Sequence, residues 1–529
     1  MNPNIKSGIT FGITGGLLTF LFGGWSVVVI GMLMGIGLGL SIGNNLERKK
    51  PLTLVMETLP AVATAGIILL VLSLLQNYFI GPVIGKAPAF PNVVIPANLV
   101  GVLGGMLLAT ITISLHGLSE VQERNGKLIL LAIVVISFPF VDDLTSLRWT
   151  AQIIFALIFV ILGMGLNIVV GYAGLLDLGY AAFFAIGAYT TGILSSPQNN
   201  IFLNFWLVIW VAAGAAAVFG ILLGAPTLRL RGDYLAIVTL GFGEIIPVVF
   251  RNLTDVTIRE PFTCLIIPGL QRLSGATSTI SCIVLAQNKN LTNGELGINP
   301  IGRPSLPVLG TFTSSNSIPW YFLIIAIILL SIFLINRLHE SRLGRAWKAI
   351  REDELAASQM GIDPVRTKLL AFSMGASFSG FAGAFYGAYI AGIFPSAFEF
   401  SASIIILCTV ILGGIGNIYG VIVGGLTIMT ADRLFLPALK DFFTGLMDHT
   451  VLPALASNHT LHDIVAQNAN PILYRYFLFG LTLVIMMAVR PEGLVPNAQR
   501  RLELHDEEET SAGVVVKENS KAKLAGKKG

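Results

Sequence analysis

Charged residues are scarce in this sequence. Asp, Glu, Lys and Arg together make up only 12% of its 529 residues, whereas 54% are hydrophobic. A typical soluble domain carries about 25% charged residues, so half of the usual polar coat is missing. Cysteine is also rare, and three cysteines exclude a small fold that is held together by several disulfides. The composition therefore argues against a water-soluble globular protein.

Signatures of common enzymes are missing as well. The sequence has no Gly-x-x-x-x-Gly-Lys-Ser/Thr phosphate-binding loop, so the chain cannot hydrolyse ATP with that machinery. It has no group of His, Cys and Glu residues at metal-ligand spacing, and no visible pairing of a nucleophile with a base. We therefore expect neither an enzyme nor a metal- or cofactor-binding chain, and no nucleic-acid partner.

Long apolar runs take the place of the missing charges. A helix that crosses a bilayer needs about 20 mostly apolar residues, and such runs recur at residues 60–80, 92–115, 150–170, 202–224, 318–338, 368–394 and 471–490. Shorter runs occupy residues 8–24, 25–43, 127–141, 176–195, 233–250 and 401–431. The 57 glycines cluster inside these runs, where small residues let helices pack closely in a membrane. We predict an all-α polytopic transmembrane helix bundle with about 11 to 14 membrane segments, some of them short or broken.

Lysine and arginine residues between the runs predict the orientation of the chain, because short cytoplasmic loops collect positive charge. Such residues occur near positions 48–50, 124–127 and 229–231, and they are most numerous at 337–368. If these loops face the cytoplasm, residues 251–317 lie outside. That external loop contains Cys264 and Cys282, which form a disulfide in one interpretation and remain two thiols in the other.

The runs divide the chain into three parts. Residues 1–148 form an N-terminal extension of about five membrane segments without a motif. Residues 149–496 form a core with an external loop at 251–317 and a cytoplasmic loop at 338–368. Glycines interrupt the 401–431 run, which we expect to form two short arms. The tail 497–529 then lies in the cytoplasm, and its mixed charges predict disorder.

The cytoplasmic loop carries a helical pattern from residue 343 to residue 360. Gly361 suits the left-handed residue that ends a helix, and Asp363 and Pro364 suit the cap and the first turn of the next helix. Small side chains near the end of the pattern would allow close docking in a groove of another protein; this face comprises Glu354, Ala356, Ala357 and Gly361. The alternative is a basic amphipathic helix that rests on anionic lipid headgroups.

A second turn on the predicted cytoplasmic side comprises Arg229, Arg231, Gly232 and Asp233. In the simplest interpretation the arginines orient the chain and Asp233 caps the following helix. The alternative is a second contact to a cytoplasmic partner.

Two acidic residues lie inside apolar runs, where a charge is costly and is therefore a candidate functional group. Asp177 and Glu244 either bond to neighbouring polar groups or lie on a water-filled path. Glycine-rich breaks are further path candidates, since irregular backbone within a membrane needs protein or water around it; they comprise Gly171, Gly174, Gly179, Gly413, Gly414, Gly416 and Asn417. Helix ends at such breaks can meet the carboxylate or ammonium group of a zwitterion. Close helix packing is the alternative for the glycines.

Several longer motifs occur in one order along the core, at residues 171–179, 187–189, 228–244, 345–354, 369–372 and 412–416. They resemble the LivM-type family of branched-chain amino acid permeases, and the resemblance covers about residues 149–496. The cytoplasmic loop is also similar to the coupling loop of ABC importer permeases, with Leu355 inserted between Glu354 and Ala356. Arg345 and Arg351 lie in the same motif. Two departures from the family pattern are Asp177 and the extra sequence around 258–290.

The resemblance implies a permease subunit that carries branched-chain or other neutral amino acids into the cytoplasm across a bacterial inner membrane. It implies as partners a second related permease, two ATPase subunits that use ATP, and an extracytoplasmic amino-acid-binding protein. A urea or short-amide importer of the same family is an alternative. An ATP-independent secondary transporter or channel is the alternative from another class; it would need paired ion-coupling carboxylates, and the sequence shows only scattered ones.

Overall fold

The structure is a computed structural model. It describes residues 3–22, 30–38 except 32 and 36, 51–76, 104–105, 120–145, 148–199, 203–227, 233–254, 290–306, 310–313, 315–447, 471–490 and 492–495. The chain divides into two compact units: unit 1 comprises Met1–Gln152 and Ala431–Arg475, and unit 2 comprises Ile153–Thr430 and Tyr476–Gly529. Each unit is described by itself below. The three-part division at residues 148 and 496 stays a prediction.

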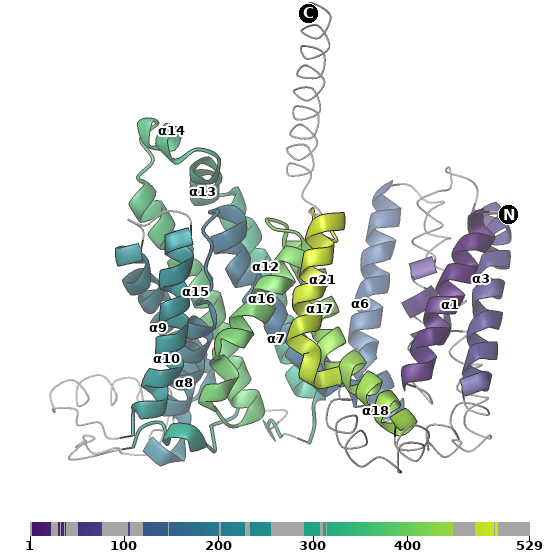
Figure 1. The fold of residues 1–529 in the computed structure, drawn as a ribbon, viewed down its shortest axis with the longest axis horizontal. Coiled ribbons are helices and arrows are strands. Elements are labelled where there is room, and N and C mark those ends of the chain that lie inside the picture. Colours follow the sequence, from purple (N-terminus) through teal and green to yellow (C-terminus); the bar gives the residue numbers. More distant parts are fainter. Residues whose placement is uncertain are drawn as a thin grey trace, which may run out of the picture. The chain divides into compact units, whose positions relative to one another are not determined.

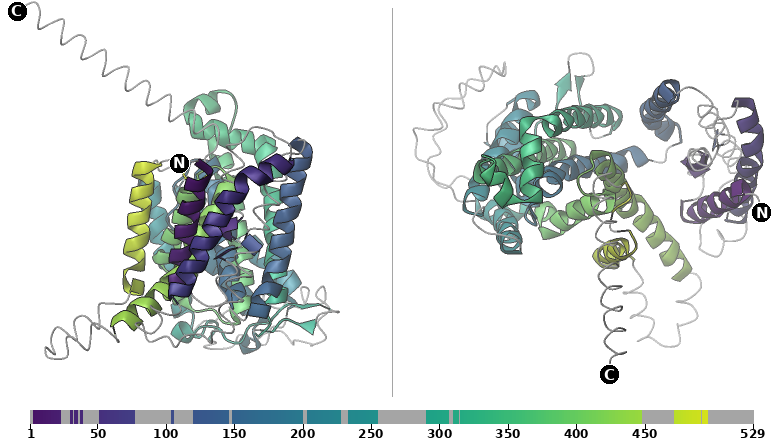
Figure 2. Two further views of the ribbon diagram at one scale, coloured as in Figure 1. Left: turned by 90° about the vertical axis from the view of Figure 1, so that its right-hand side faces the viewer. Right: turned by 90° about the horizontal axis from the view of Figure 1, so that it is seen from above.

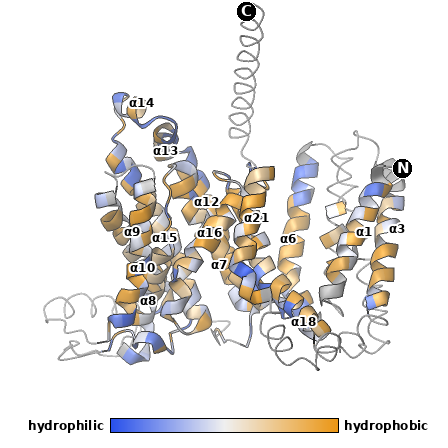
Figure 3. Ribbon diagram, in the orientation of Figure 1, coloured by the Kyte–Doolittle hydropathy of each residue, from blue (hydrophilic) through white to orange (hydrophobic). Residues whose placement is uncertain are grey.

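Apolar helices make up most of the described chain, as the hydropathy colours of Figure 3 show. Within the described ranges, eight helical segments are long and apolar enough to cross a membrane: Trp149–Tyr172, Phe205–Pro226, Tyr234–Asn252, Ile318–Glu340, Pro364–Ile390, Pro395–Gly413, Ile418–Leu446 and Ile472–Val489. This confirms the predicted polytopic helical fold. The predicted segments at 25–43 and 92–115 fall largely on residues outside the described ranges.

Unit 1 contains α1 (Pro3–Phe22), α3 (Pro51–Leu75), α6 (Glu120–Thr145), the π turn η6 (Ala431–Phe435), α18 (Leu436–Leu446) and the 3-10 turn η8 (Pro471–Tyr474). Helix α1 packs on α3 through glycines spaced four residues apart, namely Gly8, Gly12 and Gly16. A Cβ on Gly12 would lie 3.0 Å from Ile68 Cβ and 3.1 Å from Ala65 Cα. This is the small-residue spacing by which membrane helices approach closely, and it was not predicted from the sequence.

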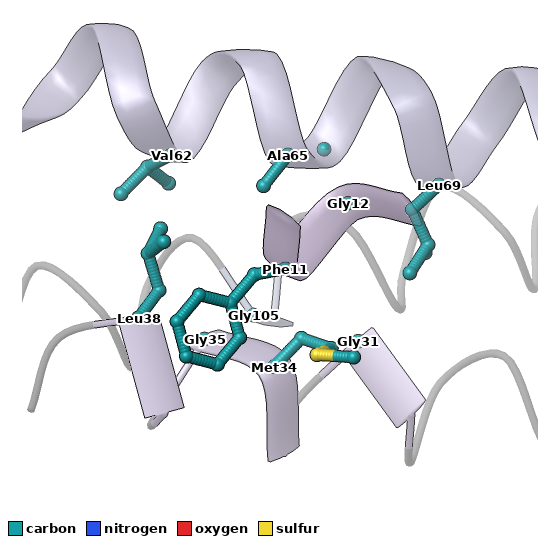
Figure 4. Close-up of a pocket in the computed structure, with 11 residues that line it drawn as sticks. Phe11, Gly12, Gly31, Met34, Gly35, Leu38, Val62, Ala65, Leu69 and Gly105 are labelled. Atoms are coloured by element: carbon teal, nitrogen blue, oxygen red, sulfur yellow. The ribbon is translucent and has the colours of Figure 1, made fainter. Parts of the chain in front are cut away.

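A small cavity lies beside α1 and α3 in unit 1 (Figure 4). Its volume is 30 Å³, and its lining is apolar throughout: Phe11, Gly12, Gly31, Met34, Gly35, Leu38, Val62, Ala65, Gly66, Leu69 and Gly105. Ligand pockets for small molecules are about ten times larger or more. The cavity is a packing gap between glycine-rich segments and not a substrate site.

Unit 2 holds the permease-like core in chain order. Its helices are α7 (Trp149–Asn167), α8 (Ala181–Ser195), α9 (Phe205–Thr227), α10 (Asp233–Asn252), α12 (Ile318–Glu340), α13 (Arg342–Glu352), α14 (Glu354–Gln359), α15 (Pro364–Ile390), α16 (Phe400–Gly413), α17 (Ile418–Thr430) and α21 (Arg475–Val489). Shorter elements are the π turn η2 (Ile168–Tyr172), the 3-10 turns η3 (Pro197–Asn199), η4 (Gly294–Leu296) and η5 (Pro395–Phe398), and an antiparallel pair of strands, β1 (Ser305–Leu306) with β2 (Gly310–Thr311).

The central helix of unit 2 is α15, which packs against α8 and α9 (Figures 1 and 2). Glycines permit this approach: a Cβ on Gly187 would lie 2.6 Å from Gly380 Cα, and a Cβ on Gly380 would lie 2.7 Å from the Ala212 carbonyl oxygen. Aromatic rings fill the C-terminal end of α15, where Trp320 makes edge contacts with Phe385 and Tyr389. Trp320 and Phe385 are fully buried, so this cluster fixes α12 against α15.

The start of α15 follows the sequence prediction. Gly361 has a φ of +85°, which is the left-handed conformation that glycine adopts without steric cost. The Asp363 carboxylate accepts hydrogen bonds from the backbone N–H groups of Val365 at 3.0 Å and Arg366 at 3.2 Å, and Pro364 occupies the first turn. The predicted helix end, cap and first turn are confirmed.

The single helix predicted over residues 343–360 is wrong, because the segment forms two helices, α13 and α14. Asp353 stands between them in an extended conformation. Its carboxylate accepts from the N–H groups of Leu355 at 2.8 Å and Ala356 at 3.0 Å. Asp at this position satisfies two of the free N–H groups that begin a helix, so it starts a second helix instead of continuing the first.

The glycine-rich interruption of the 401–431 run is also present. Helix α16 ends at Gly413, α17 begins at Ile418, and Gly414 and Gly416 between them have φ values of +119° and +84°. The two arms are not short, however. The first apolar segment starts at Pro395 and has 19 residues, and the second continues to Leu446 and has 29. The adjoining turns η5 and η6 lengthen the two arms. The prediction that both arms are short is therefore wrong, because each apolar segment is long enough to cross a membrane.

Candidate functional site

The coupling loop, residues 338–368, contains α13 and α14, which project beyond the ends of α12 and α15 (Figure 1). Trp347 anchors it: the side chain is fully buried, and its Nε1 donates to the Thr367 carbonyl at 2.7 Å. Lys368 Nζ forms an ion pair with Glu354 Oε1 at 2.7 Å, and the lysine side chain is only 8% exposed. These bonds tie both short helices to the first turns of α15, so the loop moves together with that helix.

Apolar side chains on α14 and the start of α15 point into solvent. Leu355 is 72% exposed and Met360 is 84% exposed. Together with neighbouring exposed residues they form the docking face, which comprises Leu355, Ala356, Met360, Gly361 and Val365. An exposed apolar patch with a polar rim marks a protein interaction site. Ala356 and Gly361 were predicted from the sequence as members of such a face, whereas the three large apolar residues were not.

The other expected coupling residues are not on the docking face. Ala357 is buried, and the Glu354 carboxylate is occupied by Lys368. Arg345 is exposed, and its Nη1 donates to the Glu340 carbonyl at 2.9 Å. Arg351 points the other way: its Nη1 donates to the Gly171 carbonyl. The structure thus separates the predicted set into outward-facing and inward-facing members.

The two predicted glycine-rich breaks lie next to each other. Gly171 belongs to the π turn η2, and Gly416 belongs to the break between α16 and α17. A Cβ on Gly171 would lie 2.8 Å from the Gly416 nitrogen. Asn167, which the sequence analysis did not identify, joins them: its Oδ1 accepts from the Gly416 N–H at 2.8 Å. Asn167 is buried in α7, and an asparagine within a long apolar run was the available signal.

The segment after the last helix covers the α16–α17 break. The N–H groups of Leu494 and Val495 donate to the carbonyls of Leu412 at 2.8 Å and Gly413 at 3.0 Å. Asn417 Nδ2 donates to the Val495 carbonyl at 3.0 Å. Gly413 itself packs against Gly420. Close packing therefore explains Gly413, whereas Gly414 and Gly416 supply the turn.

Asp177 and Gly179 lie in the short connection before α8. Asp177 is 1% exposed, and its Oδ1 accepts from the Gly179 N–H at 2.9 Å. Gly179 contacts the Thr239 carbonyl of α10, and the Leu178 N–H donates to Thr239 Oγ1 at 3.1 Å. An Asp that bonds to the backbone two residues later shapes a turn. These contacts favour the structural interpretation of Asp177.

Glu244 lies on the opposite face of α10 from Thr239, exposed along with Ile237, Ile245 and Val248. It lines an open groove of 530 Å³ with Ile245, Val248, Val249, Asn252 and Leu253. Within the described ranges, no side chain donates a hydrogen bond or forms an ion pair to its carboxylate. The two acidic candidates are therefore not brought together: Asp177 is enclosed in unit 2, and Glu244 faces outward.

Comparison with known proteins gives the family. Residues 150–487 match the family described as branched-chain amino acid transport system, permease component. The chain belongs to this family. The high-affinity branched-chain amino acid transport system permease protein LivM of Salmonella typhimurium is 33% identical over 400 residues, which cover 72% of this chain and 77% of that protein. LivM of Escherichia coli is 35% identical over 381 residues, with the same two shares of 72% and 77%.

The permease match extends to a second branch. The high-affinity branched-chain amino acid transport system permease protein LivH of Escherichia coli is 26% identical over 308 residues, or 56% of this chain and 87% of that protein. No solved structure matches the chain. The matched range runs from α7 to α21 and includes the coupling loop, both glycine-rich breaks and Glu244. This chain is therefore a multi-pass membrane permease component of a transport system.

Some predicted site residues of the permease lie outside the described ranges. They are Arg229, Arg231 and Gly232 of the predicted second cytoplasmic turn, and Cys264 and Cys282 of the predicted external loop. Asp233 is the first residue of α10, and its role as a helix cap remains a prediction. The disulfide and the second contact remain predictions. Among the described residues, no group of three or more His, Cys, Asp or Glu residues could hold a metal ion.

Proposed function

We propose that this chain is the permease subunit of an ATP-binding-cassette importer that carries branched-chain amino acids into the cytoplasm. The observation that carries the proposal is the docking face on a loop that is anchored to a membrane helix through Trp347 and Lys368. An ATP-driven permease that lacks a phosphate-binding loop needs a separate ATPase, and an exposed apolar patch beside anchored helices is suited to receive one. The relatives' names supply the substrate class.

The proposed assembly contains four further subunits and lies in a membrane. Two ATPase subunits bind the docking faces and use ATP, a second related permease completes the path, an extracytoplasmic amino-acid-binding protein delivers the substrate, and the whole lies in a bacterial inner membrane. The similarity to both LivM and LivH supports a pair of related permeases. The basic residues around the coupling loop support its cytoplasmic position.

The outer face of α10 is the proposed contact with the second permease. Glu244 stands near the middle of an apolar helix on an exposed face. A carboxylate at this depth is costly against lipid and is found instead beside protein or a water-filled cavity. Glu244 and Asn252 are the polar residues of the open groove on this face, and the other lining residues are apolar. We assign to Glu244 the attraction of the substrate ammonium group in the path between the two permeases.

Uptake by reconstituted vesicles tests the proposed function. The assembly is purified through an affinity tag on this chain, placed in proteoliposomes with ATP on the docking-face side, and supplied with labelled leucine, valine, alanine and urea. We expect ATP-dependent uptake of leucine and valine. Uptake of urea alone would assign the amide-importing branch, and leucine uptake that is driven by an ion gradient without ATP would assign a secondary transporter; either result contradicts the proposal.

A further inference from the structure

We infer that Arg351 and Asn167 transmit movement of the coupling loop to the two glycine-rich breaks of unit 2, an inference that rests on the proposed ATPase-driven function. Arg351 lies in the last turn of α13. Its Nη1 donates to the carbonyl of Gly171 in η2, and its Cγ lies so close to Gly174 that a Cβ there would be 2.9 Å away. The side chain therefore connects the coupling loop directly to a membrane segment 180 residues earlier.

The carbonyl that accepts this bond lies at a helix end, where a cation is favoured. The Gly171 carbonyl lies at the end of the continuous helix formed by α7 and η2. The last carbonyls of a helix have no partner within the helix and carry partial negative charge. A guanidinium group satisfies such a carbonyl and is attracted by the helix dipole. The bond thus links α13 to the end of the continuous helix formed by α7 and η2.

The held segment is itself irregular. In η2 the Ala173 N–H donates to the Ile168 carbonyl at 3.2 Å, and the Leu175 N–H donates to the Val169 carbonyl at 3.0 Å. These are wider turns than the α-helical pattern, and π turns of this kind recur at functional sites. A widened turn can shift its hydrogen bonds by one residue without unfolding the helix. It therefore offers two discrete arrangements, which transmission between sites requires.

Asn167 passes the shift to the second break. Its Oδ1 accepts from the Gly416 N–H at 2.8 Å, and its Nδ2 is buried without a hydrogen-bond partner within the described ranges. A buried unpaired donor is uncommon in folded proteins and calls for an explanation. An arrangement of the break in which Nδ2 also finds an acceptor would supply the second state. The path of transmission runs from α13 through Arg351, η2 and Asn167 to the α16–α17 break.

The first test measures uptake per ATP hydrolysed in the reconstituted assembly. Arg351→Met keeps the length of the side chain but has no donor, and Asn167→Leu removes the acceptor for Gly416. We expect each variant to lower this ratio about tenfold, and we expect the double variant to be no worse than the worse single one, because both interrupt one path. Arg351→Lys should recover part of the ratio, since it retains a charged donor.

Arg342→Met is the matched control, because Arg342 lies in the same helix, is exposed and has no place in the path. It should leave the ratio unchanged. A variant that only misfolds lowers ATPase activity and uptake together and also leaves the ratio unchanged. A full ratio in an Arg351→Met assembly that keeps the wild-type ATPase activity, or additive losses in the double variant, would overturn the inference.

The second test needs no variant. Amide hydrogen exchange of the wild-type assembly should change on addition of ATP in peptides that contain residues 168–175 and in peptides that contain residues 413–418. If neither peptide responds, the path is wrong. The outcomes also separate the two proposals: peptides that respond in an assembly that imports none of the amino acids would contradict only the proposed substrate, whereas normal import with a full ratio in Arg351→Met would contradict only the path.

Discussion

At the scale of single residues, Gly361 gives the first prediction. Its φ is +85°, and an added Cβ would meet no atom within 4 Å. A side chain therefore has room, but it imposes a left-handed strain of roughly 1–2 kcal/mol on the turn between α14 and α15. We expect Gly361→Ala to lower uptake severalfold by displacing the docking face. Uptake in proteoliposomes measures this effect.

The matched control for Gly361 is Gly214→Ala in α9. An added Cβ at Gly214 also meets nothing within 4 Å, and its backbone is helical. Alanine is favoured over glycine in a helix by about 1 kcal/mol, so the control should retain full uptake. Equal uptake by the two variants would show that the left-handed turn does not position the docking face.

Glu244 gives a second prediction at this scale, because its two environments predict opposite effects of the same substitution. If Glu244 faces the path, Glu244→Leu should lower leucine uptake at least tenfold and Glu244→Asp should retain part of it. If Glu244 faced lipid, Glu244→Leu would be stabilising and uptake would be normal. Initial uptake rates over a range of leucine concentrations, together with the thermal stability of the purified assembly, distinguish the two.

Residues near each other in the chain were predictable, and distant contacts were not. The roles of Gly361, Asp363 and Pro364 follow from local backbone chemistry, so the sequence suffices for them. Asn167 and Gly416 are 249 positions apart. Their hydrogen bond depends on how α7 packs against the α16–α17 break, which local propensity does not determine. For the same reason the sequence did not reveal that Arg351 points inward and Arg345 outward.

At the scale of elements, apolar runs located the helices well but not their ends. The run at 233–250 became α10 (Asp233–Asn252), and the run at 318–338 became α12 (Ile318–Glu340). The helical pattern at 343–360 in the loop instead split at Asp353, since a capping carboxylate outweighed the periodic pattern. Hydrophobicity reports which residues avoid water, whereas helix ends depend on individual hydrogen bonds.

The packing of α1 on α3 gives a prediction about an element. A Cβ on Gly12 would lie 3.0 Å from Ile68 Cβ and 3.1 Å from Ala65 Cα, which leaves no room for a large side chain. Gly12→Leu should destabilise unit 1 by about 1–3 kcal/mol, the usual cost of overpacking. Gly480→Leu in α21 is the control, because nothing lies within 4 Å of its Cβ position. The melting temperature of the purified chain should fall for Gly12→Leu but not for Gly480→Leu. An unchanged melting temperature for Gly12→Leu would contradict the close approach of α1 and α3.

At the scale of the whole molecule, composition predicted a polytopic membrane protein, because charged residues are scarce and apolar runs recur along the whole chain. The functional surfaces were less accessible. Leu355, Met360 and Val365 read as ordinary apolar positions of a helical pattern, and only the fold shows that they are exposed. Exposure depends on which neighbours cover a face, and in a permease part of that cover comes from other subunits. A single chain therefore exposes the docking face and the Glu244 face of α10 together.

The orientation of unit 2 gives the last prediction. Met360 and Leu296 lie near opposite ends of α15. Met360 comes just before the start of the helix. Leu296 is next to Gly297, which packs against the Ile393 carbonyl just beyond the end of the helix. Helix α15 has 27 residues and is therefore about 40 Å long, which exceeds the roughly 30 Å of a bilayer core. The two sites must lie on opposite sides of the membrane. Because the coupling loop is rich in Lys and Arg, Met360 should be cytoplasmic and Leu296 external.

Cysteine labelling decides this orientation. In a background with the three native cysteines replaced by serine, a membrane-impermeant maleimide should label Leu296→Cys in right-side-out vesicles and Met360→Cys only in inverted ones. In vesicles that contain this chain without ATPase subunits, both positions are well exposed, at 74% and 84%, so a lack of reaction reports the membrane and not burial. Glu492→Cys, which precedes the segment bonded to Leu412 and Gly413, should follow Met360. Labelling of Met360→Cys from outside would place the docking face away from ATP and would exclude the proposed contact with ATPase subunits.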